Sequence, residues 1–155
     1  MQIGADLPSL RDLYDTDFYA WTRAQAESLR RLADQPVGAA LGAGRLAREI
    51  EELGEEQRRS AHAALRELLA WMLMVDLCSI VEYRPGWLRE IARARTEFAR
   101  RATPSLLREI GDYLRPIYAE AAELAKRRLE LRGDMSAAAR PPLRCPWTIS
   151  EIIAA

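Results

Sequence analysis

The sequence contains little of what most metal-binding and disulfide-stabilised proteins require. It has one histidine and two cysteines in 155 residues, too few for a zinc finger or a disulfide framework. It also lacks an excess of either charge, since 23 Lys and Arg balance 23 Asp and Glu. This balance argues against a chain that binds nucleic acid or a membrane surface as a whole. The composition predicts one soluble globular domain over residues 1–155.

Long apolar runs are missing as well. The most apolar stretch, residues 68–81, is interrupted by Asp76 and is shorter than the roughly 20 residues that a membrane-spanning helix needs, so we interpret it as a buried core helix. The first ten residues show no basic segment followed by an apolar one, and no signal peptide is predicted. We therefore expect a cytoplasmic protein in which Cys78 and Cys145 are free thiols.

Apolar residues recur at helical spacing along almost the whole chain, and no segment alternates as a strand does. The pattern predicts an all-α helical bundle of four main helices, with a kink or break at Pro116 in the fourth helical region. The four helices are expected at about 15–33, 45–76, 87–102 and 104–132. Ser9 is expected to cap a short turn before the first helix, Asp15 or Thr16 to cap that helix, and Thr148–Glu151 to open a short C-terminal helix.

The spacing also predicts which faces are buried. Residues 35–44 contain one proline and three glycines and are expected to form a loop. The segment Leu68–Val75 is apolar on all sides and should lie at the centre of the bundle. Gly54 marks a bend or a close contact between helices, and Tyr19 lies off its stripe and is expected to be exposed. The predicted inward stripes are Phe18, Trp21, Gln25, Leu29 and Leu32 in the first helix, and Leu46, Ile50, Leu53 and Gln57 at the start of the second.

Several short motifs, in the same order along the chain, resemble those of domain-of-unknown-function family twenty-nine, a family of small bacterial proteins. The matching segments are Leu13–Thr22, Glu49–Gly54, Trp87–Arg89 with Ile91, Pro104–Leu106, Tyr118–Ala122 and Cys145–Thr148. The resemblance covers nearly the whole chain and implies a helical fold without an established activity. Where the family usually carries a His-Leu-Leu-Lys run, this sequence has Trp71–Met74. Any chemistry that family members perform with that His or Lys is therefore lost here.

A row of glutamates is the strongest candidate for metal chemistry. Glu49, Glu52 and Glu56 are three and four residues apart, so their carboxylates share one helix face, and such a row can hold Mg²⁺ together with substrate phosphates. The local Glu-Glu-x-x-Glu run resembles the acidic motif of all-α nucleoside triphosphate pyrophosphohydrolases, but the only Glu-x-x-Asp lies far along the chain at Glu109–Asp112. We favour the simpler interpretation of a solvated acidic helix start paired with neighbouring arginines, and no cofactor is predicted.

The third helix is basic, with six arginines against two glutamates between residues 84 and 101. Arg89, Arg93 and Arg100 line one flank and could contact nucleic-acid phosphates. The alternative, which zero net charge favours, is a basic helix balanced by the acidic second helix. His62 is interpreted as a surface or capping residue and Asp76 as a helix-end residue. Core packing is favoured over a stacking surface for the aromatic residues Tyr14, Phe18, Tyr19, Trp21, Trp71 and Trp87.

Three functions stay open at this stage. The favoured one is a non-enzymatic helical module that binds a protein partner or itself, because long apolar stripes suit self-association and no catalytic residue is predicted. The second is a metal-dependent hydrolase that uses Glu49, Glu52 and Glu56. The third is a nucleic-acid-associated protein that uses Arg89, Arg93 and Arg100.

Overall fold

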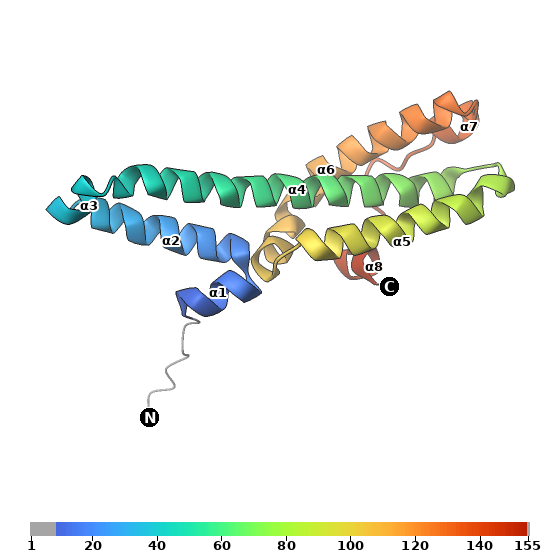
Figure 1. Cartoon of the computed structure of the whole chain (residues 1–155). Coiled ribbons are helices and arrows are strands. Elements are labelled where there is room, and N and C mark those ends of the chain that lie inside the picture. Colours follow the sequence, from blue (N-terminus) through green and yellow to red (C-terminus); the bar gives the residue numbers. More distant parts are fainter. Residues whose placement is uncertain (1–8, 155) are drawn as a thin grey trace. The chain divides into compact units, whose positions relative to one another are not determined.

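A computed structural model describes residues 9–154, and within this range every regular element is helical (Figure 1). The predicted all-α fold class is therefore confirmed. The helices are α1 (Leu10–Thr16), α2 (Phe18–Ala33), α3 (Pro36–Ala40), α4 (Ala43–Leu77), α5 (Arg84–Arg101), α6 (Pro104–Leu131), α7 (Met135–Ala138) and α8 (Ile149–Ile153), with a 3₁₀ turn at Val81–Tyr83.

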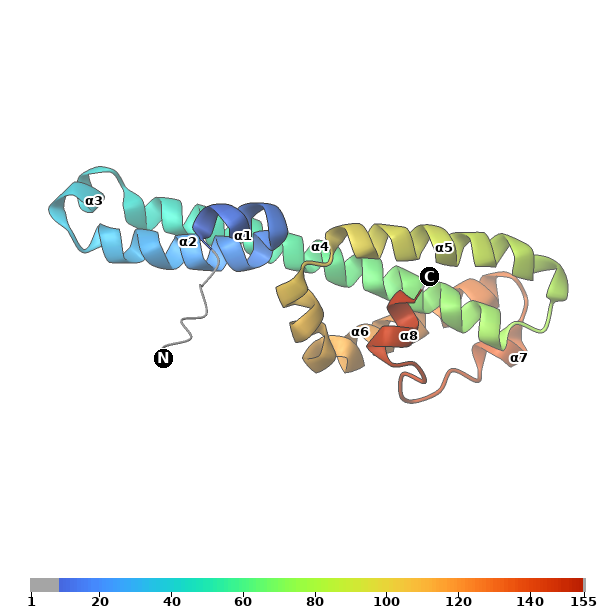
Figure 2. The same cartoon turned by 90° about the horizontal axis from the view of Figure 1, so that it is seen from below.

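The chain divides into two compact units. The described part of unit 1 contains residues 9–59 together with Thr103–Leu106, and that of unit 2 contains residues 60–102 and 107–154. In unit 1, α2 runs alongside the first part of α4, and in unit 2, α5 runs alongside the rest of α4 (Figures 1 and 2). The single domain predicted for residues 1–155 stays a prediction.

Capping residues fix the helix starts in unit 1. The Ser9 hydroxyl accepts a hydrogen bond from the Asp12 backbone N–H, and the Asp12 carboxylate accepts one in return, as the expected Ser9 cap requires. Helix α1 continues to Thr16, so the N-cap of α2 is Asp17 rather than the predicted Asp15 or Thr16. The Asp17 carboxylate accepts from the Ala20 N–H, and also from the Ser105 N–H at 2.7 Å and the Ser105 hydroxyl at 2.6 Å. One buried side chain thus connects the starts of α2 and α6.

Helices α2 and α4 pack mainly through small residues, together with Tyr19, rather than through the predicted stripes. The buried residues are Tyr19, Thr22 and Ala26 on α2 and, on the first part of α4, Ala43, Ala47 and Gly54. A Cβ added at Gly54 would lie 3.1 Å from Thr22 Cβ, so Gly54 marks a close helix contact, one of its two predicted roles. The expected exposure of Tyr19 was wrong, since the residue is 4% exposed. A hydrophobicity pattern assigns the largest apolar side chains to the buried contact, whereas two helices that lie close together need small side chains there.

The predicted loop at residues 35–44 contains helix α3, so this expectation was wrong in part. Pro36 occupies the first helical position, where its missing N–H leaves no intrahelical bond unmade. Gly42 adopts a φ of +67°, a left-handed conformation that glycine tolerates best, and α4 begins directly after it. Helix α5 begins at Arg84 rather than at the predicted Trp87. Here too a proline, Pro85, lies in the first turn of the helix instead of ending a loop before it.

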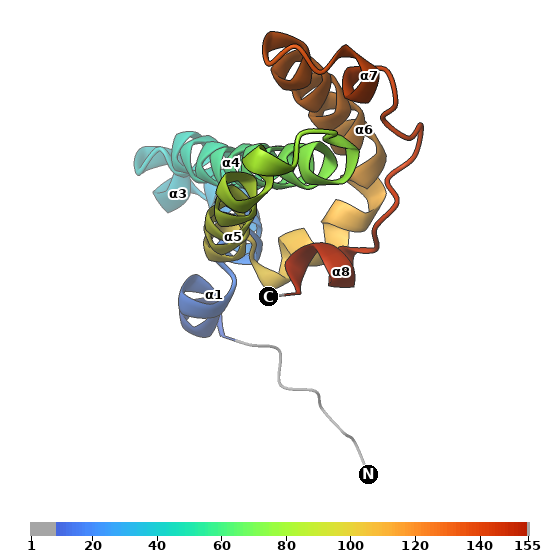
Figure 3. The same cartoon turned by 90° about the vertical axis from the view of Figure 1, so that its right-hand side faces the viewer.

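Unit 2 holds one continuous hydrophobic core, formed by α4 to α8. The predicted central segment Leu68–Val75 is buried except for the half-buried Trp71. Side chains from α5, α6, α7 and α8 complete the core, among them Phe98, Ile110, Leu129 and Ile152. Helices α6, α7 and α8 lie on the same side of the α4–α5 pair (Figure 3).

Helix α6 bends within unit 2, and capping residues fix the starts of α7 and α8. Helix α6 continues through Pro116 and changes direction along its length (Figure 3), so the predicted kink is found without a break. Asp134 caps α7 and accepts from both the N–H and the hydroxyl of Ser79, which connects α7 to the segment after α4. The Thr148–Glu151 capping box opens α8 as predicted, and Asp76 is exposed at the end of α4 as expected.

Candidate functional site

The predicted glutamate row lies on the surface of unit 1. Glu49, Glu52 and Glu56 are all exposed on α4, and Glu56 forms an ion pair with Arg59 at 2.8 Å. Among residues 9–154, no group of three or more His, Cys, Asp or Glu side chains is arranged to hold a metal ion. The Mg²⁺ site therefore stays a prediction without support from the geometry.

The predicted arginine flank is exposed on α5. Arg93 pairs with Glu90 and Arg100 with Glu97, so the carboxylates that neutralise these two arginines lie on α5 itself rather than on the acidic part of α4. Hydrogen bonds from Arg100 and Arg101, followed by their charge, lower the pKa of Glu97 to about 2. Arg89 is also exposed. The flank does not form one continuous unpaired surface.

The remaining titratable residues that the sequence singled out are partly buried in unit 2. The half-buried His62 ring lies 5.7 Å from the Tyr113 ring, and its predicted surface or capping role stays a prediction. Cys78 and Cys145 are free thiols as predicted. Burial raises the pKa of Cys145, so this thiol is less reactive than an exposed one.

Unit 1 presents an apolar surface that we call the hairpin face. Seven large side chains form it: Phe18, Trp21, Leu29 and Leu32 from α2, and Leu46, Ile50 and Leu53 from α4. Each residue turns a helix by about 100°, which places both stripes on the same side of the buried α2–α4 contact and opposite the Arg30–Glu51 ion pair. Leu46 is 49% exposed and Leu53 is 54% exposed. None of the seven side chains that the sequence assigned to the core is buried: Leu46 and Leu53 are exposed, and the other five are half-buried.

Helix α1 covers one end of the hairpin face. The Tyr14 ring packs edge-on against Phe18 at 5.6 Å and against Trp21 at 4.9 Å, and Phe18 stacks on Trp21. All of these aromatic side chains keep some exposure, and Tyr14 is 53% exposed. The leucines farther along α2 and α4 lie beyond this cluster.

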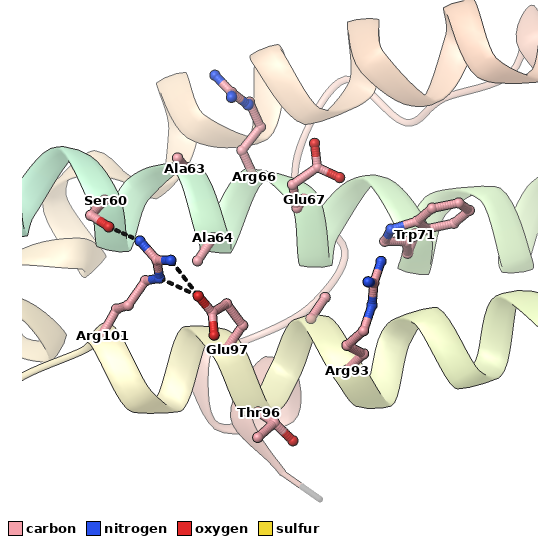
Figure 4. Close-up of a pocket in the computed structure, with 11 residues that line it drawn as sticks. Ser60, Ala63, Ala64, Arg66, Glu67, Trp71, Arg93, Thr96, Glu97 and Arg101 are labelled. Carbon is pink, nitrogen blue, oxygen red and sulfur yellow. Dashed lines mark hydrogen bonds and ion pairs between the residues drawn. The ribbon is translucent and has the colours of Figure 1, made fainter.

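Unit 2 contains a groove between α4 and α5 (Figure 4), with a volume of about 690 Å³. Ala63 and Ala64 on α4 and Ala94 on α5 line it, together with Trp71. Small side chains at facing positions leave the space open. The volume lies within the range of typical small-molecule sites.

The charged side chains of the groove differ between its two ends. At one end, Arg101 is bonded to both Glu97 and Ser60 (Figure 4), and it shares the Glu97 carboxylate with Arg100. At the other end, Arg93 extends from α5 toward Trp71 on α4, whereas Arg66 points away toward α6 (Figure 4) and pairs with Glu120 at 3.1 Å.

Sequence reasoning missed both surfaces. Arg93 belonged to a predicted site and Trp71 was assigned to core packing, but the three alanines were not predicted to line a groove. The signal that could have found the groove is a set of alanines at facing positions of two adjacent helices, with a tryptophan at one end.

Within the described range the protein is all-α, with an exposed apolar face in unit 1 and a groove in unit 2. The family described as Domain of unknown function DUF29 matches residues 13–155, and the chain belongs to this family. The resemblance found in the sequence is confirmed.

The fold has a solved relative. The chain is similar to the crystal structure of an alpha-helical protein of unknown function from Rhodospirillum rubrum, with 23% sequence identity, a TM-score of 0.77 and coverage of 90% of this chain and 88% of that one. This similarity concerns the fold alone. No curated protein matches the chain. None of the helices in residues 9–154 combines the length and apolarity that crossing a membrane requires.

Proposed function

We propose that this protein is a self-associating helical module in which a second copy packs on the hairpin face. The observation that carries the proposal is the pair of apolar stripes that α2 and α4 leave open on one side of their contact. An amphipathic helix normally buries its apolar stripe, and large exposed apolar patches typically mark interaction sites. In the free hairpin, Leu46 and Leu53 stay about half exposed.

The size of the hairpin face suits a second copy. Helix α2 has 16 residues, which corresponds to a length of about 24 Å. Two packed helices are about 20 Å wide, so each copy would bury about 500 Å² and the pair about 1,000 Å², near the lower limit of a specific interface. Because the partner surface is identical, a twofold axis makes the contact self-complementary and closed.

Charge selects the orientation of the two copies. The α4 border of the face carries Glu49, Glu52 and Glu56 together with Arg45 and Arg59, of which Arg59 pairs with Glu56, whereas the α2 border carries Ala24, Ser28 and Arg31. Packing α4 against α4 of the second copy would bring Glu49 and Glu52 of the two copies together, and such like-charge contacts are costly. The arrangement that places α2 opposite α4 of the second copy avoids this repulsion. The formal net charge of zero adds no long-range repulsion between copies.

The test replaces the two most exposed leucines of the face, Leu46→Glu together with Leu53→Glu. Light scattering after size-exclusion chromatography should give a dimer for the unmodified chain and the monomer mass of 17.6 kDa for the variant. Leu131→Glu is the matched control, since Leu131 is 86% exposed on α6 outside the face, and it should stay dimeric. A variant that dimerises like the control would contradict the proposal, as would an unmodified chain that binds a foreign amphipathic helix but never itself.

A further inference from the structure

The groove in unit 2 has a preorganised aromatic end. The Arg128 guanidinium lies over the Trp71 ring, 4.7 Å from its centroid, and is held by Glu67 at 2.9 Å. The Trp87 ring lies 6.4 Å from Trp71. These contacts fix the orientation of Trp71, which is half-buried and lines the groove. A ring that is already oriented loses little conformational freedom when a ligand packs on it.

The same end is positively charged. The Arg93 side chain is 78% exposed. Among residues 9–154, its one ion pair is with Glu90. An ion pair this exposed contributes little to stability, so an incoming anion can replace it. A smaller cavity of about 430 Å³ adjoins this end and shares Trp71 and Arg93 with the groove; Arg89 and Arg132 also line it, against the single carboxylate of Glu90.

The two carboxylates that line the rest of the groove are already bonded to arginines. The Glu67 carboxylate is bonded to Arg128 and the Glu97 carboxylate to Arg100 and Arg101. Between them lies the apolar floor of Ala63, Ala64 and Ala94. An inorganic anion would leave this floor uncovered, and a neutral apolar molecule would leave Arg93 with only its exposed pair to Glu90.

We propose that the groove binds an aromatic organic anion, with its ring system on Trp71 and the alanine floor and its carboxylate or phosphate group on Arg93. Arginine forms short, charge-assisted hydrogen bonds with either group. Trp71 supplies a flat surface for offset or edge-on aromatic packing. The site lies entirely in unit 2 and does not depend on self-association.

The test separates charge from aromatic body with three probes: 1-naphthyl phosphate, 1-naphthol and inorganic phosphate. Binding is measured by titration calorimetry and by the indole N–H signals of the four tryptophans in NMR spectra. We expect 1-naphthyl phosphate to bind at least tenfold more tightly than either other probe and to shift the Trp71 signal while Trp21 and Trp147 stay unchanged. Equal binding of naphthol or phosphate would overturn the proposal, as would a shift confined to Trp21.

Variants assign the contact. Arg93→Gln removes a charge-assisted hydrogen bond at an exposed position, so affinity should fall about tenfold or more with the fold intact. Arg115→Gln, an exposed arginine on α6 outside the groove, is the control and should bind normally. Unchanged binding by Arg93→Gln would refute the assignment. The monomeric variant with Leu46→Glu and Leu53→Glu should keep its affinity, so failure of the groove and failure of self-association are distinguishable.

Discussion

Gly54→Ala is the substitution that tests the α2–α4 contact most specifically. In an open helix position the change would stabilise by about 1 kcal/mol, because alanine is the better helix former. Here the new Cβ would overlap Thr22 Oγ1 and lie 3.1 Å from Thr22 Cβ and 3.6 Å from Tyr19 Cδ2. Thr22 is fully buried, and its hydroxyl donates to the Tyr19 carbonyl at 2.8 Å, so it cannot rotate away without losing that bond.

Inserting a methyl group into a packed contact costs about 1–3 kcal/mol, and the overlap with the Thr22 hydroxyl places this case at the upper end. After subtraction of the helix-propensity gain, we expect a net loss of about 2 kcal/mol. Urea unfolding followed by circular dichroism measures it. The control is Gly44→Ala in the same helix, whose added Cβ would lie 3.7 Å from Ala33 Cβ in ordinary contact, and which should not destabilise. If both variants are equally stable, the close contact at Gly54 is wrong.

Two further predictions concern carboxylates. Asp17→Asn should destabilise by about 2 kcal/mol, because Asp17 is a buried acceptor of charge-assisted hydrogen bonds. Burial raises the pKa of Asp17, but hydrogen bonds from Ser105 and Ala20 outweigh this effect, so the pKa is lowered. The contribution of Asp17 to the free energy of unfolding is therefore fully present above the ordinary carboxyl pKa of about 4. It is lost as the pH falls through the lowered pKa. Unfolding at pH 7 and pH 3 should show the wild-type advantage shrinking, and a constant advantage would contradict this. For Glu97, carboxyl NMR should give a midpoint of about 2 that rises in Arg100→Gln, and an unchanged midpoint would rule out the pairing.

Much of the fold follows from local sequence. Capping residues such as Ser9 and Thr148 predict their helix starts because the interaction spans only three residues. Leu68–Val75 is recognisably central because a segment that is apolar on all sides has no face to expose. Helix α3 was missed because proline and glycine, which are typical of loops, are also common at the ends of helices. Pro36 begins α3, although it was interpreted as part of a loop.

The packing of α2 on α4 could not be derived in the same way. The contact depends on Gly54 lying opposite Thr22, residues more than thirty positions apart, and neither has a large apolar side chain. Because small residues form the contact, the large apolar side chains of the two stripes lie beside it and form the hairpin face. The groove was missed for a related reason, because Ala63 and Ala94 mark an open space only when their helices are adjacent.

The central claim is that the hairpin face is closed by one identical copy. Sedimentation equilibrium of the unmodified chain over a wide concentration range tests it most directly. The account predicts an average mass that rises with concentration from 17.6 kDa to twice that value and then levels off, as a closed twofold contact requires. A mass of 17.6 kDa at every concentration, or a mass that keeps rising beyond the dimer, would contradict it.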